Sequence, residues 1–252
     1  MCRQIAYLGD DVLIGSVLSE PVHGLLRQSW RPRRQRYGTV NADGFGVGWY
    51  APWDPVPARY RRSGPIWADP VFADLARVIR TRALLAAVRS ATEGTDGGES
   101  AAAPFASGRW LFGHNGKVEG WPHAVAKNAA GLPSVALLEL EARCDSALVW
   151  ALVLHRLDAG AAPGPALADT AAELAAAAPG SRLNLLLTDG DTVAATAWGD
   201  SLYYLVEPER GAVVVASEPY DDDPRWIEVP DHTLLTATRT DVCLTPLKEP
   251  PL

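Results

Sequence analysis

The second residue of the chain is a cysteine, and the side chain of Cys2 is small enough for an aminopeptidase to remove Met1. The mature chain would then begin with a residue that carries both a thiol and a free α-amine. An ordinary α-amine titrates at about 7.7–8.0 and an ordinary thiol at about 8.5, so proton transfer from thiol to amine costs only about 1 kcal/mol. Such a residue is a nucleophile with its own general base. A cysteine that follows the start methionine by accident is the alternative at this point.

A second group of polar residues stands at the end of an apolar stretch. Arg89-Ser90-Ala91-Thr92 places a guanidinium at the end of an expected strand and a hydroxyl three residues later. The planar fork of N–H donors on arginine suits a substrate carboxylate. A structural ion pair is the alternative.

Gly113-His114-Asn115-Gly116 has the composition of a tight turn at a strand end. The side-chain amide of Asn115 and the backbone N–H of Gly116 could both point at one developing negative oxygen, which would make an oxyanion hole. An ordinary Asn-Gly hairpin turn is the alternative.

Cys144-Asp145-Ser146 opens an expected helix. Asp145 is then the N-cap or a first-turn acid of that helix, or it receives a substrate ammonium. We interpret Cys144 as a small buried hydrophobic residue and not as a second nucleophile.

Strands and helices are expected between these motifs. Apolar runs predict strands, and apolar residues at helical spacing (Phe72, Leu75, Ala76 and Ile79) predict a helix. The expected strands cover residues 2–8, 45–50, 84–88, 110–112, 183–188, 193–198, 202–206, 213–216, 234–238 and 242–244. The expected helices cover residues 69–85, 145–157 and 164–178, residues 92–104 form a loop, and Asp189-Gly190-Asp191 forms a hairpin turn. We predict a single α+β domain over residues 2–252, in which sheets face each other and helices cover the outsides.

Composition excludes several classes of partner. The chain has 252 residues, 48% of them hydrophobic, and a net charge of −7, which argues against a nucleic-acid partner. It has no apolar run of 18 residues and no apolar leader, so we expect no membrane span and no signal peptide. Three cysteines cannot form a disulfide framework and fit a reducing cytoplasm. Five scattered histidines have no ligand spacing, so we expect no metal and no cofactor, and a small molecule as the partner. The sequence does not give the oligomeric state.

One segment is locally basic. Residues 27–36 contain five arginines, namely Arg27, Arg31, Arg33, Arg34 and Arg36. This segment binds an anion or, as we expect from the acidic balance elsewhere, is a solvated or ion-paired loop.

Taken together, Cys2, Arg89-Ser90-Ala91-Thr92, Gly113-His114-Asn115-Gly116 and Asp145 occur in the order and approximate spacing of a known family. The chain resembles the class II glutamine amidotransferases, which are N-terminal nucleophile hydrolases with a four-layer αββα fold. From Cys2 to about Leu247 it is most similar to one branch, the amidohydrolases of bacterial ergothioneine biosynthesis. The motifs that carry this second similarity are Gln28-Ser29-Trp30, Asn41-Ala42-Asp43-Gly44-Phe45-Gly46-Val47-Gly48-Trp49-Tyr50, Arg182-Leu183-Asn184, Trp198-Gly199-Asp200 and Ala216-Ser217-Glu218-Pro219-Tyr220-Asp221-Asp222-Asp223.

The resemblance implies a role for each motif. The Cys2 thiolate would attack a γ-glutamyl carbonyl, assisted by its own amine. Asn115 and Gly116 would hold the oxyanion of the tetrahedral intermediate. The glutamate α-carboxylate would bind Arg89 and Thr92, and its α-ammonium would bind Asp145. Members of the branch remove glutamate from γ-glutamyl-hercynylcysteine sulfoxide without a metal, and water then cleaves the glutamyl thioester.

Two features depart from the wider family. Arg3 follows the nucleophile where many members have glycine, and the chain has no room for the synthase domain that many members carry. A hydrolase of a peptide-like γ-glutamyl amide fits a lone domain. A glutaminase that delivers ammonia to a separate synthase, a hydrolase of another γ-glutamyl metabolite, and a binding protein with a degenerate fold are the alternatives.

The residues that contact the amine part of the substrate are harder to assign. A trimethylammonium group suits aromatic faces or a carboxylate. Trp30, Trp49 and Trp198 are candidates, although each fits a packing role better. Ser217-Glu218-Pro219-Tyr220 is the stronger candidate, because it is polar and ends a strand.

Overall fold

The computed structural model describes residues 2–92, 94–95 and 97–247. In this part of the chain the strands form two antiparallel sheets. Every helix among the described residues is too short or too polar to cross a lipid bilayer.

The first sheet has seven strands in the order β11-β9-β10-β1-β4-β2-β3. Its central strand β1 pairs with β10 on one side and β4 on the other, with Ile5 opposite Ala216 and Arg3 opposite Val88. The strands are β1 (Arg3–Leu13), β2 (Phe45–Ala51), β3 (Asp54–Arg62), β4 (Arg80–Val88), β9 (Tyr203–Glu207), β10 (Ala212–Ala216) and β11 (Ile227–Glu228).

The second sheet has six strands in the order β13-β12-β8-β7-β6-β5. They are β5 (Phe105–Ser107), β6 (Trp110–Lys117), β7 (Arg182–Thr188), β8 (Val193–Ala197), β12 (Thr233–Ala237) and β13 (Val242–Pro246). Asp189-Gly190-Asp191 connects β7 to β8, which confirms the predicted hairpin.

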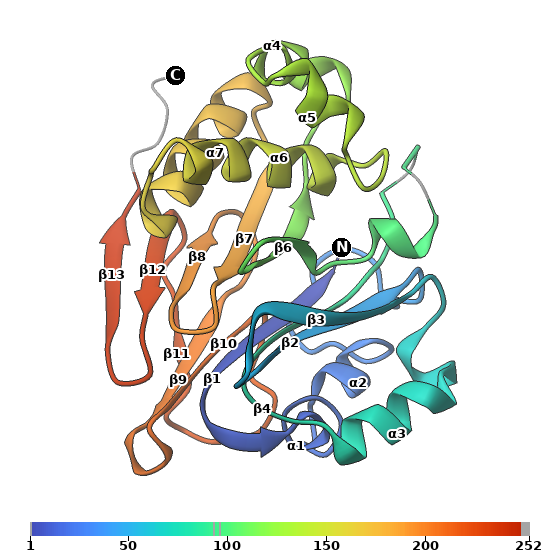
Figure 1. Cartoon of the computed structure of the whole chain (residues 1–252), viewed down its shortest axis with the longest axis vertical. Helices are drawn as coiled ribbons and strands as arrows, with labels where there is room; N and C mark the ends of the chain where they lie inside the picture. The colour runs from blue at the N-terminus through green and yellow to red at the C-terminus, as the bar shows by residue number, and fades with distance from the viewer. Residues whose placement is uncertain (1, 93, 96, 248–252) are drawn as a thin grey trace.

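Helices cover the outer face of each sheet, so the layers run helix, sheet, sheet, helix (Figure 1). The first sheet is covered by α1 (Ile14–Leu18), α2 (Leu25–Gln28) and α3 (Pro70–Val78). The second is covered by α4 (Ala126–Ala130), α5 (Ser134–Leu138), α6 (Asp145–Asp158) and α7 (Pro163–Ala177). Single-turn 3-10 helices are η1 (Ile66–Ala68), η2 (Glu99–Ala101), η3 (His123–Val125) and η4 (Pro208–Arg210). The predicted αββα arrangement is confirmed.

Strand alternation divides the core into three layers. On β1, Ile5 and Tyr7 pack against α1–α3, whereas Ala6 and Leu8 pack between the sheets. On β6, Phe112 packs against the second helical layer and Leu111 packs between the sheets. Each side of these strands therefore has a defined neighbour, which fixes where a polar side chain on either strand points.

One predicted helix is too long. The helix expected over residues 69–85 ends at Val78, and Arg80–Val88 is strand β4. Asp69 caps the helix by accepting from the Phe72 N–H at 2.9 Å, as its acidic start suggested. Most of β4 is buried on both faces, so its sequence is a continuous apolar run. That run continued the apolar pattern of the helix and made the predicted helix too long.

Other predicted boundaries are close to the observed ones. The strand expected over 2–8 begins at Arg3 and continues to Leu13, and Cys2 directly precedes it. Strands β3 and β5 were not expected. The loop expected over 92–104 contains η2, and its residues 93 and 96 lie outside the described residues.

Candidate active site

Cys2 and Asn115 meet although 113 positions separate them in the sequence. The Cys2 backbone N donates to Asn115 Oδ1 at 3.1 Å. Cys2 is partly exposed, whereas Asn115 is completely buried. Removal of Met1, which lies outside the described residues, would turn this nitrogen into the α-amine. Asn115 therefore holds the atom that would act as the general base.

The segment Gly113-His114-Asn115-Gly116 is not a turn, so that prediction is wrong. All four residues lie within β6 and pair with β7, with Asn115 opposite Asn184. By alternation from Leu111, the Asn115 side chain points between the sheets, toward β1. Its Nδ2 is 3.5 Å from Ser217 Oγ, a long contact that leaves the amide N–H able to donate elsewhere.

Gly116 can be replaced by no other residue without a shift of the backbone. A Cβ at this position would lie 1.8 Å from the Arg182 carbonyl oxygen and 2.8 Å from His114 Nε2. The close approach of β6 to β7 therefore requires glycine next to Asn115.

Asp43 holds the segment that contains Arg89 and Thr92. Asp43 Oδ2 accepts from the Ala91 N–H at 2.8 Å, and the Asp43 N–H donates to the Arg89 carbonyl at 2.9 Å. The buried Arg89 guanidinium donates to the Asp43 carbonyl at 3.3 Å and to Thr95 Oγ1 at 3.1 Å. Both acceptors are neutral oxygens, and together they orient the guanidinium.

Asp145 is the first residue of α6 and is buried. Its Oδ2 accepts from the Val118 N–H at 3.0 Å and its Oδ1 accepts from the Ser146 N–H at 2.9 Å. Cys144 is the N-cap and a buried core residue, which confirms its predicted packing role. His114 bridges Ser146 Oγ and the Arg182 carbonyl at 3.0 Å each, and so ties α6 to β6 and β7.

A cavity of about 510 Å³ adjoins these residues, and we call it the site cavity. Thr92 and Gly116 line it together, which brings two of the predicted motifs to one place. Cys2, Arg89 and Asp145 are not among its lining residues. The lining residues are Ala91, Thr92, Gly94, Gly116, Lys117, Gly120, Trp121 and Arg182.

Arg182 lines this cavity, and motif reasoning gave it no role. Its Nε donates to Asp200 Oδ2 at 3.2 Å, and its guanidinium lies 4.5 Å from the centre of the Tyr37 ring. Burial raises the pKa of Asp200, and the nearby charges of Arg182 and Arg3 oppose that rise. The motif Arg182-Leu183-Asn184 was the only sequence signal for it.

Two of the three aromatic candidates are at least partly buried in the packed layers, and the third, Trp30, is exposed. Trp198 is buried in the core beneath the second helical layer and contacts His232 with ring centres 4.6 Å apart. Trp49 packs partly buried on the first helical layer. Trp30 packs edge-on against Trp67 with ring centres 5.7 Å apart.

The segment 217–220 reaches the site through its first residue, since Ser217 Oγ lies between Asn115 Nδ2 and the Gln4 N–H, which donates to it at 3.0 Å. In the basic segment 27–36, Arg33 pairs with Asp222 at 2.8 Å, which fits an ion-paired loop.

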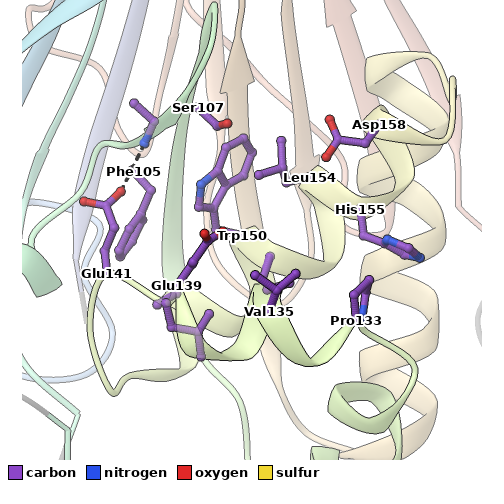
Figure 2. Close-up of a pocket in the computed structure, with 15 residues that line it drawn as sticks. Phe105, Ser107, Pro133, Val135, Glu139, Glu141, Trp150, Leu154, His155 and Asp158 are labelled. Atoms are coloured by element: carbon purple, nitrogen blue, oxygen red, sulfur yellow. Dashed lines mark hydrogen bonds between the residues drawn. The ribbon is translucent and has the colours of Figure 1, made fainter.

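A second cavity, of about 340 Å³, lies on the helix-covered side of the second sheet (Figure 2). Residues of α5, α6 and β5 line it, including Val135, Trp150 and Phe105. Glu141 at its edge accepts from the Ala106 N–H at 3.4 Å. None of the predicted site residues lines this cavity, so it is separate from the site cavity. Over the described ranges, no group of three or more His, Cys, Asp or Glu side chains could hold a metal ion.

Comparisons with known proteins identify relatives of this chain. The chain is 42% identical over 248 residues to proteins named gamma-glutamyl-hercynylcysteine sulfoxide hydrolase. These are from Mycolicibacterium smegmatis (98% of this chain, 100% of the relative) and Mycobacterium tuberculosis (98% and 97%).

Solved structures show the same fold. A glutamine aminotransferase class-II domain protein from Silicibacter pomeroyi is 26% identical with a TM-score of 0.71, covering 98% of this chain and 99% of its own. Glutamine phosphoribosylpyrophosphate amidotransferase from B. subtilis is 14% identical with a TM-score of 0.67, covering 98% of this chain and 49% of its own. The family model for class-II glutamine amidotransferases matches residues 24–250. The chain therefore belongs to the class-II glutamine amidotransferases.

Proposed function

We propose that this chain hydrolyses the γ-glutamyl amide bond of γ-glutamyl-hercynylcysteine sulfoxide, a step of ergothioneine biosynthesis. The products are glutamate and hercynylcysteine sulfoxide. The observation that carries the proposal is the 42% identity, over nearly the whole chain, to hydrolases named for this substrate. The contact between Cys2 N and Asn115 Oδ1 supports it independently, because the side-chain amide of Asn115 is then next to the proposed nucleophile.

In this reaction the Cys2 thiol attacks the γ-carbonyl and passes its proton to the Cys2 α-amine. The hydrogen bond to Asn115 Oδ1 uses an N–H of the amine and so leaves its lone pair free to accept that proton. Asn115 Nδ2 and the Gly116 N–H donate to the oxyanion. The α-ammonium then protonates the leaving amine as the C–N bond breaks. Water, activated by the same amine, hydrolyses the glutamyl thioester.

The glutamyl group is held by charges of both signs. Arg89 binds the α-carboxylate, helped by Thr92, which lines the site cavity. The hydrogen bonds from the Arg89 guanidinium to the Asp43 carbonyl and to Thr95 Oγ1 support this role, because they fix its orientation. Asp145 binds the α-ammonium, and its two backbone hydrogen bonds fix the carboxylate before substrate arrives.

We further propose that the chain folds as a single domain over residues 2–252, of which residues 248–252 lie outside the described part. It needs no cofactor. We propose the cytoplasm as its location, since none of the three cysteines, all within the described part of the chain, forms a disulfide.

The test is glutamate release from a panel of γ-glutamyl compounds, including the hercynyl sulfoxide and glutamine, with Met1 removal verified by intact mass. Cys2→Ala should abolish release, whereas Cys243→Ala, a change at an exposed cysteine of β13, should not alter it. Protein that retains Met1 should be inactive, since it lacks the amine base. Ammonia release from glutamine at a higher kcat/KM than glutamate release from the sulfoxide would identify a glutaminase instead.

A further inference from the structure

Arg3 is a buried cation directly after the proposed nucleophile. Its side chain is 0% exposed, and its Nε donates to the Cys2 carbonyl oxygen at 2.8 Å. Burial lowers the pKa of the guanidinium, and the charges of Glu218 and Asp200 act in the opposite direction. A buried charge is costly unless it is paired and hydrogen-bonded. The contact with Cys2 gives this charge a specific function at the site.

Glu218 supplies the opposite charge from the end of the neighbouring strand. The Ser217 N–H donates to the Gln4 carbonyl at 2.9 Å, which continues the pairing of β1 and β10 past the end of β10. The next residues, Arg3 and Glu218, then lie opposite each other on one face of the sheet. Arg3 Nη1 is 3.9 Å from Glu218 Oε2, and both side chains are fully buried.

The same carboxylate holds a loop that contacts a residue of the site-cavity wall. Glu218 accepts from the Arg33 N–H at 3.0 Å and from the Arg34 N–H at 2.7 Å. Further along this loop, Tyr37 contacts the guanidinium of Arg182, which lines the cavity. A chain of contacts therefore runs from the backbone of the nucleophile to the wall of the cavity.

We propose that Arg3 is a positioning residue for Cys2, and that Glu218 couples it to the loop of residues 33–37. This inference rests on the proposed function, because it assigns both residues to the same γ-glutamyl hydrolysis. The planar guanidinium uses Nε for the Cys2 carbonyl and Nη1 for Glu218, so the peptide after the nucleophile is held in one orientation. Lysine has a single ammonium and cannot reproduce this fixed geometry.

The test uses mature protein without Met1 and four variants: Arg3→Lys, Glu218→Gln, the double variant Arg3→Met/Glu218→Gln, and Arg61→Met as control. Arg61 is a matched control because it forms a partly buried pair with Glu141 at 2.7 Å, away from the site. The measurements are kcat and KM for L-γ-glutamyl-p-nitroanilide, the rate of Cys2 alkylation by iodoacetamide, and the thermal unfolding midpoint.

A misplaced nucleophile lowers turnover more than binding, by up to about 100-fold. We expect Arg3→Lys to lower kcat about tenfold with KM within about twofold, and the double variant to lower kcat and alkylation further while it stays folded. Glu218→Gln should raise KM about threefold or more, because it loosens the loop. Arg61→Met should change only the unfolding midpoint.

Three results would overturn the inference. They are a folded double variant with wild-type kcat and alkylation, an Arg61→Met variant with the same loss of kcat, and an unchanged kcat in Arg3→Lys. The last decides the question if the double variant does not fold. If the wild type cleaves no γ-glutamyl compound, the proposed function fails, whereas the alkylation rates still test the role of Arg3.

Discussion

Replacement of Asn115 tests the proposed chemistry most directly, because the two ends of its side chain have different roles. Oδ1 accepts from the Cys2 nitrogen at 3.1 Å, and Nδ2 is the proposed oxyanion donor. Asn115→Ala removes both groups. Asn115→Asp keeps an oxygen that can accept from Cys2 and replaces the donor by a second oxygen, which would repel the oxyanion.

The contacts of Asn115 set the expected magnitudes. Nδ2 is 3.5 Å from Ser217 Oγ, so this contact contributes little to the free energy of folding. The Nδ2 amide group can therefore donate to the oxyanion in the transition state. The Oδ1 contact is one partly buried hydrogen bond, whose loss costs about 1 kcal/mol of folding free energy. Loss of an oxyanion donor raises the barrier by about 3–4 kcal/mol, which is roughly 100- to 1000-fold in kcat. Turnover should therefore fall far more than stability.

The assay is glutamate release under saturating substrate, together with thermal unfolding of each variant. Both Asn115 variants should lose kcat by at least about 100-fold, with KM nearly unchanged. Asn128→Ala is the control, since Asn128 is also buried and donates a side-chain hydrogen bond, to Glu173 at 2.9 Å. If Asn115→Ala changed KM alone, or if Asn115→Asp retained normal kcat, Asn115 would not be the oxyanion donor.

Three further predictions concern neighbouring residues. Arg89→Ala and Asp145→Ala should each reduce kcat/KM by at least about tenfold for every γ-glutamyl substrate alike, because each removes a charge-assisted contact to glutamate; a loss that depended on the leaving amine in the substrate panel would contradict this. Gly116→Ala should lower the unfolding midpoint by several degrees or prevent folding, since its Cβ would lie 1.8 Å from the Arg182 carbonyl; a normal midpoint would refute the close approach. Burial raises the pKa of the Asp200 carboxyl above its ordinary 3.8, so the folded state binds the carboxyl proton more tightly than the unfolded state does. Protonation of Asp200 therefore stabilises the folded state at low pH, and this contribution is lost as pH rises through the folded-state pKa. Denaturant titrations measure the free energy of unfolding of wild type minus that of Asp200→Asn, and this difference should fall as pH rises above 3.8. A difference that rose with pH would mean that the pKa of Asp200 is lowered in the folded state.

Much of the fold could be predicted because local patterns and tertiary packing agree. Helices α6 and α7 have a distinct helical periodicity, and the hairpin between β7 and β8 has distinct turn residues. The predicted bounds of these elements differ from the observed ones by one or two positions at most. The boundary between α3 and β4 could not be predicted. Leu84–Val88 packs against both neighbouring layers, so its apolar run carries no period that separates a strand from a helix.

The residue type of Cys2 alone suggests chemistry, and that role stays a prediction. Contacts that depend on strand pairing could not be predicted from the sequence. Asn-Gly is the commonest hairpin signal, yet Asn115-Gly116 lies inside β6 because β7 approaches it closely. In the sequence, Arg3 was notable only because many members of the family have glycine at this position. Its partner Glu218 is 215 residues away, and only the register of β1 against β10 brings the two together.

The alternation of β1 places the two contacts of the proposed nucleophile, Cys2, on opposite faces of the first sheet. On the inner face, Asn115 reaches across from the second sheet and holds the Cys2 nitrogen. On the outer face, Arg3 holds the Cys2 carbonyl and is itself paired with Glu218. The two atoms that flank the Cys2 α-carbon are thus fixed from opposite sides of one strand. Because the thiol is carried on Cβ, these two contacts hold the backbone from which the Cys2 side chain extends, and each contact comes from a different layer of the fold.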